Sequence, residues 1–330
     1  MELEQRIQSL DAEREVLFQE LTLLKHQHHE NQKSLVQRLT TATLTRQSSS
    51  KDKIKLFRDL FKGRDDVYPK RYVNSKSGKP GYSPVCSNEW KPNVCDKPRI
   101  KCGDCQFRSF IPISDPVISN HLAGSDNARN PQADFVIGVY PLMPDERCWF
   151  LAVDFDKSAW QQDVGAFVAA CKENNIPYSI ERSRSGKGAH VWLFFSTPVL
   201  AIEARKLGSL VLTQAMDKYP ELGFDSYDRL FPNQDTMPKG GFGNLIALPL
   251  QKMPREQGNS VFVDDELFPY PDQWAYLSTV KRITPIELNH WVAKAEQQNR
   301  VLGVKLPIQE EESEPLENVT ITQAQRNQYQ

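Results

Sequence analysis

The sequence predicts an α/β (α+β) fold, in which a layered sheet carries helices on at least one face. From about residue 135 onward, short apolar runs typical of strands alternate with longer segments of helical periodicity. The composition, with 39% hydrophobic and 25% charged residues, is that of an ordinary globular protein. A chain of 330 residues is long enough for a sizeable core with further segments around it. No apolar run approaches the length of a membrane span.

Residues 1–39 predict a coiled-coil helix. Leucine fills one seam position of the heptad every seven residues, at Leu3, Leu10, Leu17 and Leu24. The other seam position carries two apolar and two polar residues, namely Ile7, Arg14, Leu21 and His28. Such a seam favours self-association or docking to a partner, and the alternative is an amphipathic helix packed on its own domain. The charged start of the chain is unlike a secretory signal, so we expect a cytoplasmic protein without membrane attachment.

Residues 40–52, rich in Ser and Thr, predict a flexible linker, and residues 53–63 predict a short helix. The region 53–132 is basic in character, because residues 51–110 contain 15 Lys and Arg against 7 Asp and Glu, a net charge of +8. A basic segment in a chain whose net charge is −1 is a candidate nucleic-acid surface. The plainer interpretation is a solvated basic face, which charge alone does not exclude.

Residues 133–300 hold the strands and helices of the predicted core. Strands are expected at 135–140, 149–156, 177–182, 188–195 and 243–249. Helices are expected at 159–174, 201–218 and 285–298. Beyond about residue 300 the chain turns acidic and then rich in Gln and Asn without periodicity, so residues 301–330 predict an acidic, disordered tail.

Four cysteines lie within the segment 86–105 at the spacing C-x8-C-x6-C-x2-C. They are Cys86, Cys95, Cys102 and Cys105. Four thiolates suit a closed structural Zn²⁺ site, and disulfides are not expected in a cytosolic protein. The last pair, with Gly and Asp between its cysteines, is typical of a tight knuckle, whereas the longer spacings are less stereotyped. A thiol redox pair and unliganded core cysteines are therefore the alternatives, and core positions are predicted for Cys148 and Cys171.

Asp154 and Asp156 stand at the end of the apolar run 149–153. In a strand, side chains at i and i+2 point to the same face, so the two carboxylates would lie side by side. Paired oxygen ligands of this kind suit Mg²⁺ or Mn²⁺, and divalent ions on paired carboxylates are typical of nucleotidyl transfer. The alternative is a polar turn in which Asp156 caps a helix that starts near Ser158.

The segment Ser183-Arg-Ser-Gly-Lys-Gly188 joins two predicted strands, and His190 follows it. It is not a Walker loop, because the G-x4-GK[ST] spacing is absent, yet its small residues would let backbone amides approach a triphosphate. The imidazole of His190 would be able to donate to a phosphate oxygen. A simple hairpin turn and a core histidine are the alternatives.

A third carboxylate further along the chain would complete a site for two metal ions. Asp228 and Asp225 both qualify, and Asp235 does so less well. Arg229 and Lys239 are candidates for phosphate contacts because both carry a positive charge close to these aspartates in the sequence.

The order Asp-x-Asp, then small residue-x-His, then a single Asp resembles the three motifs of the archaeo-eukaryotic primase superfamily. Here these motifs are Val153-Asp-Phe-Asp156, Gly188-Ala-His190 and Tyr227-Asp228. The chain is most similar to the primase domain of TOTE conflict systems, which often lies beside a superfamily II helicase. The similarity covers about residues 53–295 and rests on four strings: CSNEW at 86–90, SGKGAH at 185–190, DRLFPNQD at 228–235 and GFGNLIALPLQ at 241–251.

The resemblance implies an archaeo-eukaryotic primase-like core with an RRM-like antiparallel sheet, next to an N-terminal α/β half that completes the cleft. It also implies that Asp154, Asp156 and Asp228 hold two Mg²⁺ or Mn²⁺ ions, with Asp225 as the alternative to Asp228. The phosphates of the incoming nucleotide would be bound by residues of the Gly-rich segment and by nearby basic side chains, namely Ser185, Gly186, Lys187, Gly188, His190, Arg229 and Lys239.

The sequence therefore predicts a DNA primase-polymerase, which performs template-directed nucleotidyl transfer from (d)NTPs on single-stranded DNA and carries a structural Zn²⁺ module. The alternatives are a gap-filling repair polymerase that only extends primers, a nuclease that uses the same carboxylates, and a non-catalytic zinc and coiled-coil module that binds nucleic acid. A superfamily II helicase partner and a role in conflict or defence follow from the resemblance alone. Sugar preference, template preference and oligomeric state stay open, as does membership of a longer helicase-containing chain.

Overall fold

A computed structural model describes residues 5–7, 10, 12–19, 21–22, 41–126, 134–238 and 240–297. By its internal contacts the chain divides into two compact units. Unit 1 comprises Met1–Lys53 with Pro271–Val280, and unit 2 comprises Ile54–Tyr270 with Lys281–Gln330. These boundaries differ from the five segments expected from the sequence, and that division stays a prediction.

In unit 1, the described residues between 5 and 22 are helical. The described apolar residues of the predicted seam are 47–59% exposed, as expected for a helix face without a partner; they are Ile7, Leu10, Leu17 and Leu21. Because Leu3, Leu24 and His28 lie outside the described residues, the coiled coil stays a prediction.

The segment 41–49, expected to be a flexible linker, makes specific hydrogen bonds within unit 1. The N–H of Arg46 donates to Oδ2 of Asp272 at 2.8 Å, and the N–H of Thr43 donates to Oγ of Ser278 at 3.2 Å. Asp272 also caps helix α7 (Gln273–Ser278). The connection is therefore fixed to a helix rather than unattached.

The centre of unit 2 is a five-stranded sheet in the order β7-β4-β6-β5-β9, and every neighbouring pair in it is antiparallel. The strands are β4 (Arg147–Phe155), β5 (Ser179–Arg182), β6 (Ala189–Leu200), β7 (Tyr227–Phe231) and β9 (Val261–Val263). The mixed α/β class and the antiparallel sheet are thus confirmed. The finer comparison with an RRM-like sheet stays a prediction.

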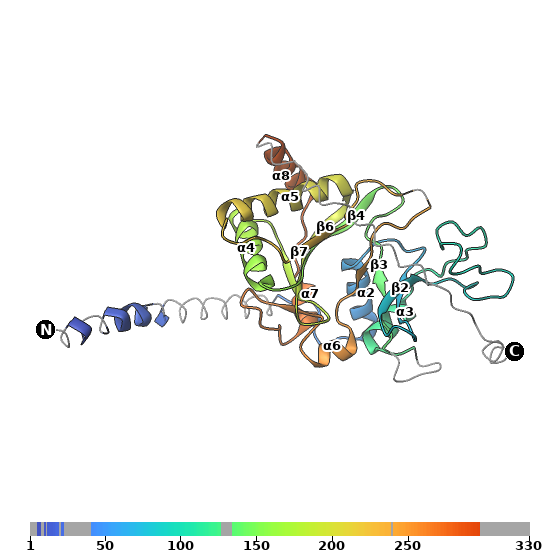
Figure 1. Cartoon of the computed structure of the whole chain (residues 1–330), viewed down its shortest axis with the longest axis horizontal. Helices are drawn as coiled ribbons and strands as arrows, with labels where there is room; N and C mark the ends of the chain where they lie inside the picture. Colours follow the sequence, from blue (N-terminus) through green and yellow to red (C-terminus); the bar gives the residue numbers. More distant parts are fainter. Residues whose placement is uncertain are drawn as a thin grey trace. The chain divides into compact units, whose positions relative to one another are not determined.

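Helices α4 (Trp160–Glu173), α5 (Ala201–Lys218) and α8 (Pro285–Gln297) gather beside the central sheet (Figure 1). The strand residues that face α4 and α5 are apolar: Phe155 packs on Phe167 of α4 with ring centroids 5.7 Å apart, and Leu151 lies against Gly208 of α5. Both strand residues are fully buried, and each such side chain contributes about 1.5–3 kcal/mol through burial. None of the described helices has the length and apolar character that a membrane crossing requires.

The opposite face of the sheet is aromatic along most of its length. Phe61, which follows helix α2 (Ser50–Leu60), packs on Trp192 and Phe194 with ring centroids 5.1 and 5.6 Å apart. The helix begins at Ser50 rather than Lys53, because the hydroxyl of Ser49 accepts from the N–H of Asp52 and so caps it. Toward one end this face becomes polar, and the candidate site lies there.

Several short elements of unit 2 were not predicted from the sequence. They are the hairpin β1 (Pro69–Val73) and β2 (Pro80–Pro84), helices α3 (Asp115–Ala123) and α6 (Lys252–Glu256), and strands β7 and β9. The strands expected at 135–140 and 243–249 shrink to the two-residue pair β3 (Gly138–Val139) and β8 (Ile246–Ala247). The hairpin was not predicted because β1 and β2 contain proline and glycine, two residues that are depleted in strands.

Candidate active site

One row of side chains crosses the sheet on the face opposite α4 and α5. In the register of the strands Arg229 lies opposite Asp154, Asp154 opposite His190, and His190 opposite Glu181. Residues directly opposite in antiparallel strands point to the same face, with Cβ atoms about 4.5–5.5 Å apart. We refer to Arg229, Asp154, His190 and Glu181 as the polar row.

A β-bulge brings Asp228 to the same face as this row. The ladder between β4 and β7 shifts by one residue, since Phe155 pairs with Tyr227 whereas Asp154 pairs with Arg229. Asp228 is therefore the extra residue, and two consecutive side chains of β7 point the same way. Consistent with this, Nε of Arg229 donates to Oδ2 of Asp228 at 2.6 Å.

Asp156 follows directly after β4 and is held through its backbone. Its N–H donates to the carbonyl oxygen of Ser226 at 2.7 Å. Ser226 is buried, and its hydroxyl donates to Oδ2 of Asp163 in α4 at 2.6 Å. Asp163, which the sequence did not single out, thus ties the start of β7 to α4. The cap alternative does not hold, since the N-cap residue of α4 is Ala159 and no side chain caps it.

The negative charges at this end of the sheet favour the binding of a cation. Burial raises the pKa of Asp154, the neighbouring carboxylates of Asp228 and Asp156 raise it further, and His190 opposes them. Oδ1 of Asp156 is buried and has no hydrogen-bond partner, with only the ammonium of Lys157 at 3.8 Å. Carboxylate oxygens are ligands of the type that Mg²⁺ and Mn²⁺ bind. Over the described ranges, however, no three His, Cys, Asp or Glu side chains are already grouped as a metal site.

The ring of His190 lies between two carboxylates. Its Nδ1 is 2.9 Å from Oε2 of Glu181, and its Nε2 is 3.5 Å from Oδ1 of Asp154. Burial lowers the pKa of the ring, but Glu181 and Asp154 outweigh this and raise the pKa of His190 to about 9. The two carboxylates therefore favour the protonated imidazole, which stands on the same face as the aspartates.

The Gly-rich segment 183–188 forms the hairpin turn between β5 and β6. A simple hairpin turn was the alternative to a phosphate-binding segment in the sequence analysis. The N–H of Ser183 donates to the carbonyl of Gly188 at 2.9 Å, and the N–H of Gly186 donates to that of Ser183 at 3.0 Å. Any Cβ at Gly188 would overlap the carbonyl oxygen of Phe155, so the turn lies directly against the residue that precedes Asp156. Ser185 and Lys187 are exposed at the tip.

The other predicted acidic and basic residues are placed less centrally. Asp225 is exposed in the loop before β7, and Asp235 pairs with Arg205 of α5. Lys239 lies outside the described residues. Of the third-carboxylate candidates, Asp228 is the one whose charge acts on Asp154.

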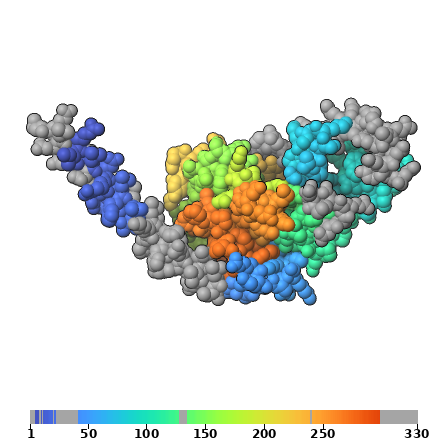
Figure 2. Space-filling model, turned by 90° about the horizontal axis from the view of Figure 1, so that it is seen from below, coloured from blue at the N-terminus to red at the C-terminus, as the bar shows by residue number. Residues whose placement is uncertain are grey.

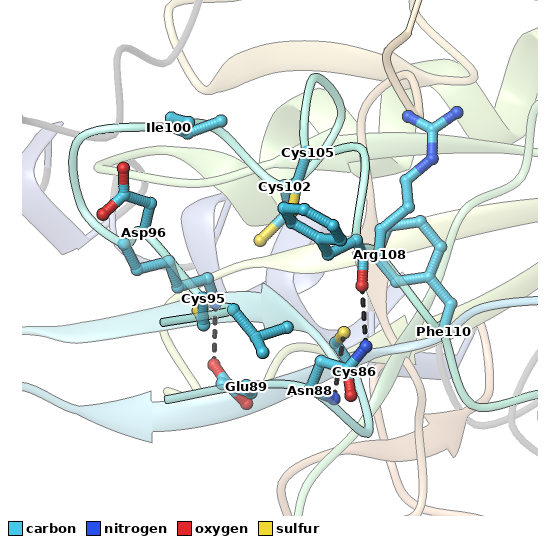
Figure 3. A pocket seen from close by; sticks show the side chains of 13 residues that line it. Cys86, Asn88, Glu89, Cys95, Asp96, Ile100, Cys102, Cys105, Arg108 and Phe110 are labelled. Atoms are coloured by element: carbon cyan, nitrogen blue, oxygen red, sulfur yellow. Dashed lines mark hydrogen bonds and ion pairs between the residues drawn. The ribbon is translucent and has the colours of Figure 1, made fainter. Parts of the chain in front are cut away.

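The four predicted zinc ligands line one small cavity of about 20 Å³ in the loops between β2 and α3. Figure 3 shows Cys102 and Cys105 adjacent to each other, with Cys86 and Cys95 on separate loop segments around the cavity. Figure 2 shows the cyan residues that lead into these loops at the surface of the molecule. Thiols are the ligands of structural zinc, so the donor set fits Zn²⁺, although within the described residues the four sulfurs are not close enough together to form a metal cluster.

Two backbone amides already point at one of these sulfurs. Sγ of Cys86 accepts from the N–H of Asn88 at 3.4 Å and from that of Ser109 at 3.3 Å. Burial raises the pKa of the Cys102 thiol, and the ammonium of Lys97 opposes this shift. By contrast, Cys148 and Cys171 are fully buried in the core, as predicted.

Comparison with known proteins identifies the family of this chain. None of the curated proteins matches it. Among solved structures, the polymerase domain from Mycobacterium tuberculosis Ligase D in complex with DNA is 12% identical over 76% of this chain and 89% of that chain, with a TM-score of 0.37. That likeness is too weak to bear on the site. The model of the family described as TOTE conflict system, Archaeo-Eukaryotic Primase domain matches residues 52–291. The chain therefore belongs to the archaeo-eukaryotic primase domain family of TOTE conflict systems.

Proposed function

We propose that this protein is a primase-polymerase that performs template-directed nucleotidyl transfer on single-stranded DNA. The observation that carries the proposal is that Asp154 and Asp228 stand on neighbouring strands at one end of the sheet, with Asp156 directly after β4 and His190 opposite Asp154. Membership of a primase domain family supports the same reaction class.

In this proposal Asp154, Asp156 and Asp228 would hold two Mg²⁺ or Mn²⁺ ions. Such ions, when bound, activate the attacking 3′-hydroxyl and stabilise the leaving pyrophosphate. The buried oxygen of Asp156 without a hydrogen-bond partner supports this assignment. So does the raised pKa of Asp154, because a carboxyl group that is costly to ionise alone ionises readily beside a cation.

The nucleotide's phosphates would meet positive charge on the same face. His190 and Arg229 flank Asp154 in the polar row, so both would reach a triphosphate that lies over it. The hairpin turn would add backbone amides and the exposed side chains of Ser185 and Lys187, next to Gly186 and Gly188. Lys239 is proposed as a further phosphate contact on sequence grounds alone.

The cysteine segment would bind a structural Zn²⁺ and contact the DNA. Its surface carries large exposed aromatic side chains, since Trp90 is 57% and Phe107 is 52% exposed, among lysines and arginines. Aromatic rings beside basic residues suit the stacking of unpaired bases. Self-association through residues 1–39 and a superfamily II helicase as partner complete the proposal, the latter because the family is defined within TOTE conflict systems.

The test is incorporation of labelled nucleotides on a single-stranded DNA template without primer, with Mg²⁺ and Mn²⁺ tried separately. The wild type should form new oligonucleotides, and the double variant Asp154→Ala/Asp156→Ala should form none. A matched double variant, Asp217→Ala/Glu221→Ala, removes two exposed carboxylates near the end of α5 and should behave as wild type.

Each alternative function predicts a different pattern in the same assay. A gap-filling polymerase would be silent without primer and active once a primer is annealed. A nuclease would shorten labelled DNA without added nucleotides. A binding module would hold DNA with a steep salt dependence and incorporate nothing in either format. Incorporation by the double variant Asp154→Ala/Asp156→Ala would show that the carboxylates are wrongly assigned.

A further inference from the structure

Glu181 is a buried carboxylate that the three sequence motifs do not contain. Its side chain is 3% exposed in the middle of β5, between β6 and β9. Glutamate is almost never buried unless it is paired, and a buried ion pair often stabilises a fold less than apolar residues of similar volume. A role in the site explains its presence better than stability does.

A single oxygen of Glu181 accepts two hydrogen bonds from β6. Oε2 lies 2.9 Å from Nδ1 of His190 and accepts from Nε1 of Trp192 at 3.1 Å. His190 and Trp192 are two residues apart, so both side chains stand on the face of the polar row. The carboxylate thus links the imidazole to the indole.

Trp192 in turn is immobilised by the aromatic face of the sheet. Its ring stacks on Phe194 with centroids 5.9 Å apart at an interplanar angle of 7° and packs on Phe150 at 5.0 Å. It has no exposed surface. Because the indole ring is held in place, its N–H group is held in place as well. The hydrogen bond from this N–H in turn holds Oε2 of Glu181 at the position where it contacts Nδ1 of His190.

We propose that Glu181 is a positioning residue for nucleotide binding: it accepts the Nδ1–H of His190 and so directs Nε2 of that ring toward the carboxylate face beside Asp154. This inference rests on the proposed function for the identity of the ligand, which is the triphosphate of the incoming nucleotide. With Nδ1 engaged by Glu181, the ring presents Nε2 on the carboxylate face. Without that acceptor, the hydrogen bond that holds Nδ1 of the ring in this orientation would be lost.

Three variants separate positioning from mere structural support. Glu181→Met keeps the length of the side chain and removes the acceptor. Glu181→Gln keeps one oxygen that can accept from both donors and removes the charge. Ser179→Ala is the matched control, because Ser179 is buried on the same strand and the same face but pairs with Trp192 rather than His190.

Steady-state kinetics on a primed template give the first readout. Loss of the acceptor should raise the KM for nucleotide about 10-fold or more in Glu181→Met, with kcat changed less than about 3-fold, because a phosphate contact made before and during reaction is lost. Glu181→Gln and Ser179→Ala should stay within about 3-fold of wild type in both constants. Equal damage in the Met and Gln variants would overturn the proposal, since charge rather than direction would then matter.

A second readout needs neither nucleotide nor activity. The chain has six histidines, so ¹⁵N-histidine labelling and His190→Gln assign the Nδ1–H resonance of His190. That resonance should be visible and shifted downfield in wild type, Glu181→Gln and Ser179→Ala, and absent in Glu181→Met. Persistence in Glu181→Met would overturn the proposal. A wild type that shows the resonance but incorporates no nucleotide would instead refute the proposed function.

Glu181→Asp replaces the Met variant if the latter does not fold, as judged from its thermal unfolding. The aspartate withdraws the carboxylate from His190 by one methylene and retains the charge. It should therefore show the same rise in KM and the same loss of the resonance, and wild-type values for both would contradict a positioning role.

Discussion

The polar row and the cysteine segment hold their side chains by different means. Each member of the polar row sits on a strand and is placed by backbone hydrogen bonds to its neighbours. The loops that carry the four cysteines have only turns and the isolated bridge between Cys86 and Phe110. A site on strands exists before its ligand arrives, whereas a site on loops depends on the ligand to close it.

The polar row and the cysteine segment also differ in how closely their side chains are already arranged within the described residues. The charge of Asp228 already raises the pKa of Asp154, and Nδ1 of His190 already lies 2.9 Å from Oε2 of Glu181. The cysteines line a common cavity yet form no grouped metal site among the described residues. We therefore expect changes in the sheet to act on catalysis with little effect on folding, and changes in the cysteine segment to act on folding first.

The largest effect on catalysis is expected for Asp228→Ala. Loss of one ligand of a two-metal site removes several kcal/mol of transition-state stabilisation, a factor on the order of 10³ in rate. The control Asp225→Ala removes an exposed carboxylate three residues earlier and should change the rate less than about 2-fold. Primer extension with Mg²⁺ measures both. If Asp225→Ala reduced the rate more than Asp228→Ala, Asp225 would be the third metal ligand, and the bulge at Asp228 would have no role in catalysis.

Sequence patterns were able to locate Asp154 and His190, because each stands at one end of a continuous apolar run that is typical of a buried strand. They were not able to choose between Asp225 and Asp228, because the choice depends on a one-residue shift in the ladder between β4 and β7. Such a bulge follows from packing and leaves no periodic signal. Glu181 and Asp163 escaped notice for a related reason: a single acidic residue in a short strand or helix gives no sign that it is buried.

The next largest effect is expected for loss of a zinc ligand. Cys102→Ser should lower the bound zinc from about one ion per chain to a small fraction of that, measured by elemental analysis, and should lower the Tm, since a structural zinc supplies folding free energy. The control Cys171→Ala alters a buried core thiol and should lower the Tm while leaving the zinc content intact. Purified wild type without zinc, and a Tm insensitive to chelator, would refute the zinc module.

A smaller effect is expected where the turn meets β4. A Cβ at residue 188 would overlap the carbonyl oxygen of Phe155, so Gly188→Ala should displace the backbone beside Asp156, cost about 1–3 kcal/mol and reduce incorporation about 10-fold. Gly165→Ala is the matched control, because a Cβ there meets nothing within 4 Å. In the interior of α4 it should stabilise the fold by about 0.5–1 kcal/mol. Wild-type incorporation by Gly188→Ala would show that the turn does not set the position of Asp156.

The smallest effect concerns a contact between the two regions. A Cβ at Gly103, in the knuckle between Cys102 and Cys105, would overlap the carbonyl oxygen of Gly240. Gly240 belongs to the loop between β7 and β8, in which Phe242 packs on Tyr140 with ring centroids 5.0 Å apart. Gly103→Ala should therefore push the knuckle away from this loop and lower incorporation about 3-fold.

Zinc content and incorporation, measured on the same preparation of Gly103→Ala, decide what this contact does. Retained zinc with reduced incorporation would mean that the cysteine segment supports the loop after β7, and through it the strand that carries Asp228. Retained zinc with unchanged incorporation would mean that the two regions act independently. In that case the cysteine segment contributes to DNA binding, and the end of the sheet suffices for the chemistry, because the strands, the turn at Gly188 and the link from Ser226 to Asp163 set its geometry without the cysteine segment.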